Sequence, residues 1–320
     1  MQKKIKNTSK YIFLILMLFV LIVPATYISA TENPANIFEQ YQQYVDTFDV
    51  TMRFDNFLLN HEDAPRPMTE YVISAADYTL VDGMSIRLYQ DVEGVDGISV
   101  WTDEEGLIQW EVNVAQGGLY HMAVKYYSVE GKNSTIQRAI LINGQLPYFE
   151  AGTVNFYRTW VNQLDYIQQD NQGNDLRPTQ IEEHLWREIA VRDAMREHNE
   201  YLSFYLQPGL NTITFISQRE PMIINSIRLF NQADTPSYLE YSANLSSQPR
   251  PDIEDIRIEG QASTRRSSAT LAPRINMSGP GVYPYDPRLM RVNYIGGDAW
   301  RSPGDWIEWN LPCLKRDFIK

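Results

Sequence analysis

Alternating apolar and polar residues dominate the middle of the chain. Between Leu107 and Val114 every second residue is apolar, which places Ile108, Trp110 and Val112 on one face of a predicted strand. The same pattern, or a short apolar run, predicts strands at 119–127, 139–142, 201–206, 212–217 and 222–230. Turns rich in Gly, Asn and Pro separate them. The sequence therefore predicts a mainly β chain, with an antiparallel β-sandwich over residues 68–232.

A short leader precedes this pattern. Its aromatic and apolar residues have roughly helical spacing, so we expect one helix within residues 31–67. The residues that define the spacing are Phe38, Tyr41, Tyr44, Val45 and Phe48. Breaker residues at 63–67 end this helix, and Pro65–Pro67 is interpreted as a linker.

The hydrophobic periodicity does not decide the secondary structure of residues 150–200. The apolar residues Ile181, Leu185 and Ile189 allow a helix by local propensity. An extended course across the edge of the sandwich is equally compatible with the pattern. Both alternatives stay open at this point.

The region after the sandwich indicates an internal duplication. Residues 233–252 are rich in Ser, Pro and Asn and are interpreted as a second linker. Gly304–Pro312 then repeats the Gly and Ile-x-Trp pattern of Gly106–Val114, and the two linkers share an x-Pro-Arg-Pro motif. A spacing near 190 residues separates the two copies. Residues 253–320 are therefore predicted to begin a second β-sandwich.

This second copy is short. Eleven residues follow Trp309, and the last eight, Cys313–Lys320, are basic, unpatterned and hold the single cysteine of the chain. We expect a frameshifted or truncated gene product; a genuine short strand with a basic end is the alternative. Half a sandwich leaves strand edges uncovered. Residues 253–320 are thus expected to be poorly packed or to lean on the first domain.

The N-terminus has the pattern of a secretory signal peptide over residues 1–30. Four lysines precede an unbroken apolar run from Ile12 to Val23, and Ile28-Ser29-Ala30 offers a small residue for cleavage. Twelve apolar residues are short for a membrane span, although an uncleaved anchor is the alternative. No cysteine follows the run, which excludes a lipoprotein anchor. We expect a secreted, extracellular or cell-envelope protein.

Charge and cysteine content exclude several classes. The chain has 40 Asp and Glu against 28 Lys and Arg, a net charge of −12. An acidic chain is a poor nucleic-acid binder, because binding phosphate requires clustered Lys and Arg. One cysteine excludes an internal disulfide framework and a Cys-rich zinc site.

Aromatic residues beside polar residues are the best ligand candidates. A sugar ring stacks its C–H face on an aromatic ring, while its hydroxyl groups require hydrogen bonds from polar side chains. Two stretches combine both kinds of residue, one before a turn and one in the undecided segment. The candidates are Trp101, Asp103, Asn155, Tyr157, Arg158 and Trp160. The alternative is that the aromatic residues of the segment only pack it onto the sandwich.

One oxygen-rich loop is a candidate for a structural calcium ion, and no other cofactor is predicted. Calcium binds six to eight oxygen ligands and often uses a Gly for a tight turn. The candidate ligands are Asp170, Asn171, Asn174 and Asp175, with Gly173 between them. An ordinary Asn/Gly turn is the alternative.

The sequence does not predict an enzyme. Acidic clusters occur at Asp103–Glu105 and Glu182–Glu183, but a glycosidase needs two carboxyl groups that face each other across a sugar. The four histidines lack metal-ligand spacing, and no nucleophile elbow or phosphate-binding loop is present.

Several of these motifs together resemble a known module. They are Gly106–Val114, Gln116–Tyr120, Ile142-Asn143-Gly144 and Pro208-Gly209-x-Asn211-x-Ile213. They resemble the galactose-binding-like jelly roll of carbohydrate-binding modules of the family 6/35 type. The wider order, with Ile73-x-Ala75-Ala76-Asp77-Tyr78 after the linker, is similar to the N-terminal region of large extracellular solute-binding proteins of sugar-type ABC importers in Bacilli such as Paenibacillus.

The resemblance implies a secreted, non-catalytic module that binds a carbohydrate or polysaccharide. It implies a fragment of an importer's solute-binding protein, which contacts the importer's membrane components if the full-length protein exists. The chain departs from that family because it lacks the solute-binding domain. The alternatives are a structural spacer or protein-contact sandwich of the cell envelope and, with less support, a glycoside hydrolase or lyase.

Overall fold

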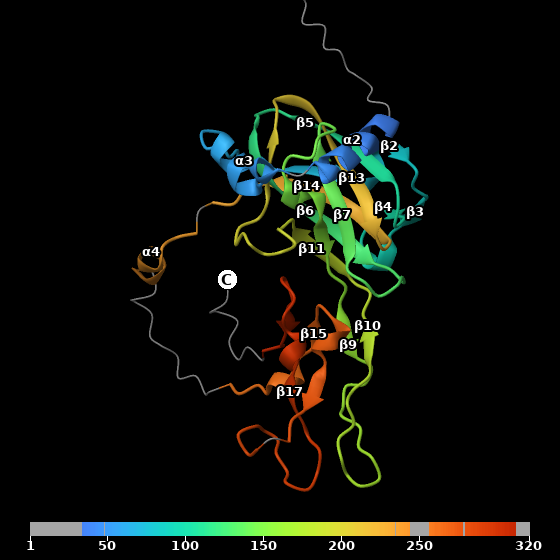
Figure 1. Ribbon diagram of the computed structural model, residues 1–320, viewed down its shortest axis with the longest axis vertical. Helices are drawn as coiled ribbons and strands as arrows, with labels where there is room; N and C mark the ends of the chain where they lie inside the picture. The colour runs from blue at the N-terminus through green and yellow to red at the C-terminus, as the bar shows by residue number, and fades with distance from the viewer. Residues whose placement is uncertain (1–33, 48, 234, 244–255, 278, 312–320) are drawn as a thin grey trace, which may run out of the picture. The chain divides into compact units, whose positions relative to one another are not determined.

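Two large antiparallel sheets form the body of the molecule (Figure 1). The computed structural model describes residues 34–47, 49–233, 235–243, 256–277 and 279–311. The larger hydrophobic core contains residues from both sheets. The predicted antiparallel β-sandwich is thus confirmed. The predicted signal peptide and the Cys313–Lys320 segment lie outside the described residues.

The first sheet has seven strands and the second has five. The first runs in the order β11 (Trp186–Ala190), β6 (Gly118–Ser128), β14 (Met222–Phe230), β4 (Ile98–Thr102) and β3 (Ile86–Gln90), with β1 (Tyr71–Ser74) on β14 and β12 (Ser203–Leu206) on β6. The second runs in the order β2 (Tyr78–Asp82), β5 (Leu107–Val114), β13 (Gly209–Arg219), β7 (Ile136–Ile142) and β8 (Val154–Phe156).

The period-two pattern of β5 explains its place in the core. Its even-numbered residues are buried, whereas Glu111 and Asn113 on the other face are exposed. Trp110 is fully buried and meets Phe215 of β13 edge to face, with ring centroids 5.2 Å apart. Across the core, Tyr126 of β6 meets Phe156 at 5.2 Å. The alternation of apolar and polar residues therefore predicted the buried face of β5 correctly.

The leader contains two α-helices rather than the one expected. Helix α2 (Pro34–Asp46) places Ile37 and Tyr41 against the outward face of the second sheet, in a cluster with Leu107 and Leu141. The predicted apolar face was partly wrong, because Phe38 is 41% exposed.

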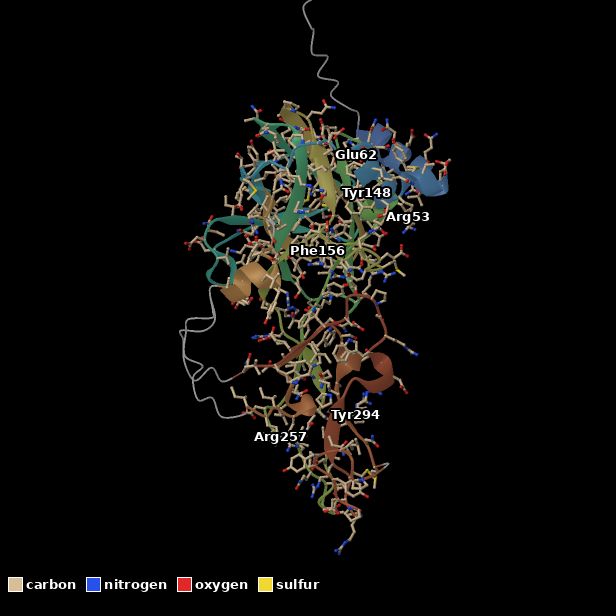
Figure 2. The ribbon with its side chains drawn as sticks, turned by 90° about the vertical axis from the view of Figure 1, so that its left-hand side faces the viewer. Arg53, Glu62, Tyr148, Phe156, Arg257 and Tyr294 are labelled. Carbon is tan, nitrogen blue, oxygen red and sulfur yellow. The ribbon has the colours of Figure 1, made fainter. Side chains whose placement is uncertain are left out.

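Helix α3 (Phe54–Asn60) packs at one end of the sandwich. Phe54 lies 4.8 Å from the ring of Tyr148, and the buried Glu150 accepts its backbone N–H at 2.9 Å. Figure 2 shows Arg53 and Tyr148 at this end. A third helix, α4 (Tyr238–Ala243), follows the sandwich. None of the described helices is long and apolar enough to span a membrane.

Residues 150–200 contain four short strands joined by turns and irregular segments, which decides against the helix. Strands β8 and β11 each join one sheet of the sandwich, whereas β9 (Trp160–Asn162) and β10 (Gln180–Glu182) pair with each other. Among the described residues of this stretch there is no α-helix. We call residues 160–182 the β9–β10 hairpin.

The described residues within 256–311 add two strands to a four-stranded sheet that they share with this hairpin, and they form a separate two-stranded sheet. Strand β15 (Arg265–Arg266) pairs with β9 on one side and with β18 (Ile307–Glu308) on the other, while β16 (Pro273–Ile275) pairs with β17 (Val292–Ile295). Arg266 is fully buried and donates to Asn162 at 2.8 Å. The segment therefore leans on the first domain, one of the two outcomes expected from the sequence.

Candidate functional site

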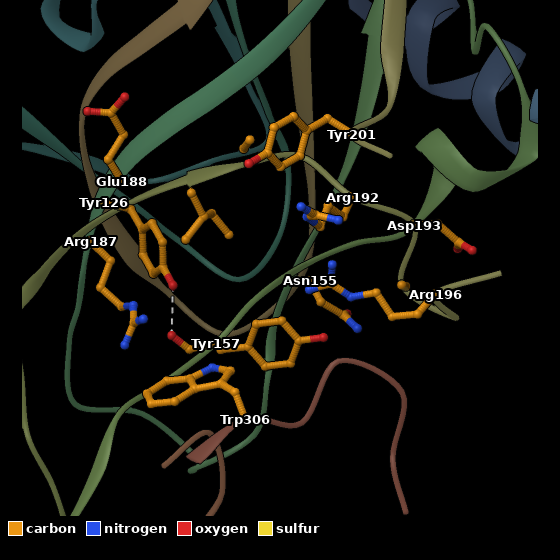
Figure 3. A pocket seen from close by; sticks show the side chains of 13 residues that line it. Tyr126, Asn155, Tyr157, Arg187, Glu188, Arg192, Asp193, Arg196, Tyr201 and Trp306 are labelled. Atoms are coloured by element: carbon orange, nitrogen blue, oxygen red, sulfur yellow. Dashed lines mark hydrogen bonds between the residues drawn. The ribbon is translucent and has the colours of Figure 1, made fainter. Parts of the chain in front are cut away.

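A hollow of about 280 Å³ lies beside β11 (Figure 3). Its walls come from β6, the chain around Tyr157, β11 and the loop after it, and the residue before β18. It is lined by Tyr126, Asn155, Tyr157, Arg187, Glu188, Ile189, Ala190, Arg192, Asp193, Ala194, Arg196, Tyr201 and Trp306. Because arginine and tyrosine dominate the polar lining, we call it the Arg/Tyr pocket.

A buried carboxylate shapes the loop that follows β11. Asp193 is 3% exposed and accepts the backbone N–H groups of Met195 at 2.9 Å and Glu197 at 2.7 Å. These two bonds close a tight turn, in which Arg196 adopts a left-handed φ of 56°. The turn holds the Arg196 side chain at the pocket wall that Figure 3 shows beside Asn155.

Two tyrosines fix one wall of the pocket. The Tyr126 hydroxyl donates to the Tyr157 carbonyl oxygen at 2.7 Å, and burial raises the pKa of Tyr126, so this hydroxyl keeps its proton. The Tyr157 hydroxyl donates to the Pro303 carbonyl oxygen at 3.4 Å. Tyr157 is thus held at its backbone and at its hydroxyl group, and it lines the hollow.

Guanidinium groups lie on the other two aromatic rings of the lining. The Arg187 Cζ atom is 4.3 Å from the Trp306 ring centroid, and the Arg192 Cζ atom is 4.2 Å from the Tyr201 centroid. Cation–π contact favours both arrangements. Tyr157 has neither a cation nor a ring against its face among the described residues.

The acidic groups of the pocket are already paired. Glu188 accepts from Arg228 at 2.6 Å, and Asp193 is bound to backbone N–H groups as described above. A carboxylate that acts as a general acid or base needs access to the substrate proton. Both acidic side chains of the lining therefore already have partners within the protein, although the Glu188 side chain is 42% exposed.

The structure brings two of the predicted ligand residues together. Asn155 and Tyr157 both line the Arg/Tyr pocket. Trp101 and Asp103 are at the end of β4 and do not line it; Arg87 covers the Trp101 ring at 4.7 Å, and Asp103 accepts the N–H of Glu104.

The other two predicted residues have structural contacts. The Arg158 side chain is 2% exposed and is paired with Glu182 and Glu220. Trp160 lies in β9, where its backbone pairs with those of Glu182 and Arg266. Their role as ligand residues stays a prediction.

Sequence reasoning missed most of the pocket. Arg187, Arg192 and Tyr201 belong to a stretch in which arginine recurs beside aromatic residues, and this density was the available indication. No sequence pattern indicated Trp306, because it lies more than a hundred residues further along the chain. It reaches the pocket through the pairing of β9 with β15.

The predicted calcium ligands separate into two groups. The Asp170 carboxylate accepts the side-chain and backbone N–H groups of Asn174, both at 2.9 Å, and these bonds lower the pKa of Asp170. Asp175 instead reaches residues 291–292: it accepts from Arg291 and from the backbone N–H of Val292, both at 2.9 Å. The calcium site remains a prediction. In the structure, the carboxylate oxygens of Asp170 and Asp175 accept hydrogen bonds from other groups of the protein.

The Asp175 contact gives a pH prediction. Burial raises the pKa of Asp175, but the hydrogen bonds from Gln169, Val292 and Arg291 outweigh it and lower the pKa overall. The carboxylate therefore stabilises the contact above its unfolded pKa of about 3.9 and loses this effect as the pH falls through the lower folded pKa. We expect the amide NMR shift of Val292 to titrate with a midpoint below 3.9. Asp175→Asn should abolish this titration, and Asp170→Asn should not.

Three carboxylates of the acidic clusters that a glycosidase would require are paired with cations. Arg158 binds both oxygens of Glu182 at 2.7 and 2.8 Å, and Arg265 binds Glu183 at 2.5 Å. Lys132 binds Glu104 at 2.6 Å. Within the described ranges, no group of three His, Cys, Asp or Glu residues could hold a metal ion.

No protein-family model and no curated protein sequence matches the chain. Among solved structures, it is similar to a family 35 carbohydrate-binding module from Clostridium thermocellum (16% identity, TM-score 0.31, 51% of this chain and 99% of that chain). It is also similar to the CBM35 of Cellvibrio japonicus Abf62 (14% identity, TM-score 0.31, 52% of this chain and 95% of that chain). A third similar structure is a GH26-CBM35 β-(1,4)-mannanase from Podospora anserina (13% identity, TM-score 0.31). The match covers 53% of this chain but only 29% of the mannanase chain.

Proposed function

We propose that the protein is a secreted, non-catalytic carbohydrate-binding protein whose ligand site is the Arg/Tyr pocket. The observation that carries the proposal is the anchored ring of Tyr157, which lies among hydrogen-bond donors and has an unpartnered face. A sugar binds such a site with its C–H face on the ring and its hydroxyl groups on Asn155 and the arginines. Each guanidinium offers up to five donors.

The size of the pocket sets the expected ligand. Ligand pockets commonly measure about 300–1,000 Å³, and this one, at about 280 Å³, is near the lower limit. It therefore suits a short saccharide or the end of a longer chain. The pairing of all nearby carboxylates supports binding without catalysis.

Replacing Tyr157 tests the proposal. In calorimetric titrations of the whole chain against a panel of oligosaccharides, we expect Tyr157→Ala to weaken binding about tenfold or more, as a central aromatic contact does in other interfaces. Trp101→Ala is the matched control, because Trp101 lies outside the pocket and should leave affinity unchanged. Thermal unfolding of both variants shows that each is folded.

Two results would contradict this function. One is that no oligosaccharide of the panel binds at millimolar concentration. The other is that Trp101→Ala and Tyr157→Ala lose affinity equally. Repeating the titration with calcium and with a chelator tests the calcium prediction for residues 170–175.

The importer context is a further part of this proposal. The order of leader, linker and sandwich supports it, and contact with importer membrane components would follow if the chain belongs to a longer solute-binding protein. A spacer or protein-contact sandwich is the alternative, and it predicts normal folding without sugar binding.

A further inference from the structure

A turn-and-strand unit of the sandwich occurs a second time in residues 258–309. In the sandwich, the 3₁₀ turn Ala75–Asp77 leads into β2, which pairs with β5. In the second segment, the 3₁₀ turn Gly260–Ala262 leads into β15, which pairs with β18. The residue after each turn, Tyr78 or Ser263, has the same φ of −64° and ψ of 143°.

The same tryptophan contact closes both units. The indole N–H of Trp110 donates to the carbonyl oxygen of Ala75 at 2.9 Å, and that of Trp309 donates to Gly260 at 3.0 Å. Both acceptors are the first residue of their 3₁₀ turn. Both donors lie at the end of an Ile-x-Trp motif.

A threonine contact is repeated as well. The Thr79 hydroxyl donates to the carbonyl oxygen of Gln109 at 3.5 Å, and the Thr264 hydroxyl donates to that of Glu308 at 3.0 Å. Each acceptor directly precedes the tryptophan of its unit. The strand registers agree too: Leu80 pairs with Gln109 and Val81 with Ile108, as Arg265 pairs with Glu308 and Arg266 with Ile307.

The two units differ in what lies on the far edge of the tryptophan strand. Strand β5 has β2 on one edge and β13 on the other. Strand β18 has β15 on the corresponding first edge, and no described residue pairs with its other edge. Backbone groups alternate in direction along a strand, and the Thr264 bond places the Glu308 carbonyl on the β15 side. The backbone groups of Ile307 and Trp309 therefore point to the open edge.

We propose that the open edge of β18 is a strand-acceptor site, which binds one antiparallel polypeptide strand with the pattern of β13. Unpaired backbone groups along an edge are a template for such β-augmentation. The first unit shows what this edge accepts, because the same local geometry is covered there by β13.

The pairing in the sandwich defines the chemistry of the incoming strand. In β13, Phe215 lies opposite Ile108 and Ile213 lies opposite Trp110. The incoming strand thus carries bulky apolar residues at two alternate positions, opposite Ile307 and Trp309. The backbone amides of those two positions donate to β18.

A peptide that copies β13 tests the site. The probe is a synthetic peptide of residues 209–217, GLNTITFIS, added to the intact chain and followed by hydrogen exchange and mass spectrometry. We expect exchange in fragments covering 306–311 to slow about tenfold at saturating peptide. The matched control is the same peptide with N-methyl groups at the positions of Ile213 and Phe215, which removes two backbone donors and should weaken binding about tenfold or more.

Every other outcome overturns the proposal. Unchanged exchange at 306–311 means that the edge does not accept the strand, and slow exchange there without peptide means that it is already covered. Equal protection by the N-methylated peptide means that binding does not use the edge. Protection of β5 alone means that the peptide enters the sandwich instead.

Discussion

Arg158→Met is expected to lower the free energy of unfolding by about 3–5 kcal/mol, because it leaves buried carboxylates without their cation. Arg158 donates to Glu220 at 2.8 Å and to Glu182 at 2.7 Å. Glu220 is fully buried, so water cannot take the place of the guanidinium as the partner of its carboxylate. Folded proteins are stable by only about 5–15 kcal/mol, which makes this a large share of the total.

The other bonds of Arg158 add to the expected loss. Its guanidinium also donates to the carbonyl oxygens of Val129 at 2.6 Å and Ser134 at 2.8 Å. Glu220 accepts the backbone N–H of Ser134 at 2.9 Å. The pair therefore ties the 129–134 loop to the start of the β9–β10 hairpin, and its removal should loosen both.

Urea unfolding of the variant measures the effect, and Lys132→Met is its control. Lys132 forms an ion pair with Glu104 at 2.6 Å, but its side chain is 72% exposed. Water and salt screen an exposed ion pair, so it contributes little to stability and the control should hardly shift the transition. Equal losses in the two variants would contradict a special role for the buried pair.

The sheets could be predicted from the sequence because strand periodicity is a local property. Strand β5 was expected and observed over the same residues, Leu107–Val114, since one face is buried and the other is not. The apolar run of β7 also indicated a strand, but it did not indicate which element covers the outward face of that strand. Leu141 faces helix α2, and only the three-dimensional packing shows that the outward face of this sheet is covered.

The candidate site was less predictable because its parts meet through long-range contacts. Asn155 and Tyr157 were identified from local composition, as an aromatic ring beside an amide. Arg158 has the same local context, yet its side chain points into a buried ion pair that involves Glu220, which is 62 residues away. Trp306 reaches the pocket because β15 pairs with β9, and no local pattern encodes that pairing.

Trp110→Ala is the second change with a large expected effect, again about 3–5 kcal/mol of unfolding free energy. The indole is fully buried between the sheets and packs on Phe215, so its removal exposes neighbours to a cavity. It also leaves the Ala75 carbonyl oxygen without the N–H that it accepts at 2.9 Å. Urea unfolding followed by far-UV circular dichroism measures the loss.

Trp309→Ala is the matched control, because it removes the same indole and the same type of hydrogen bond from the second unit. Trp309 is only partly buried, it is not part of the sandwich core, and its indole N–H donates to Gly260 of the second unit. We expect the main unfolding transition to shift by less than about 1 kcal/mol, since little apolar surface is lost from the core. Hydrogen exchange should instead become faster around Gly260 alone. A shift as large as that of Trp110→Ala would mean that the sandwich depends on the second unit for its stability.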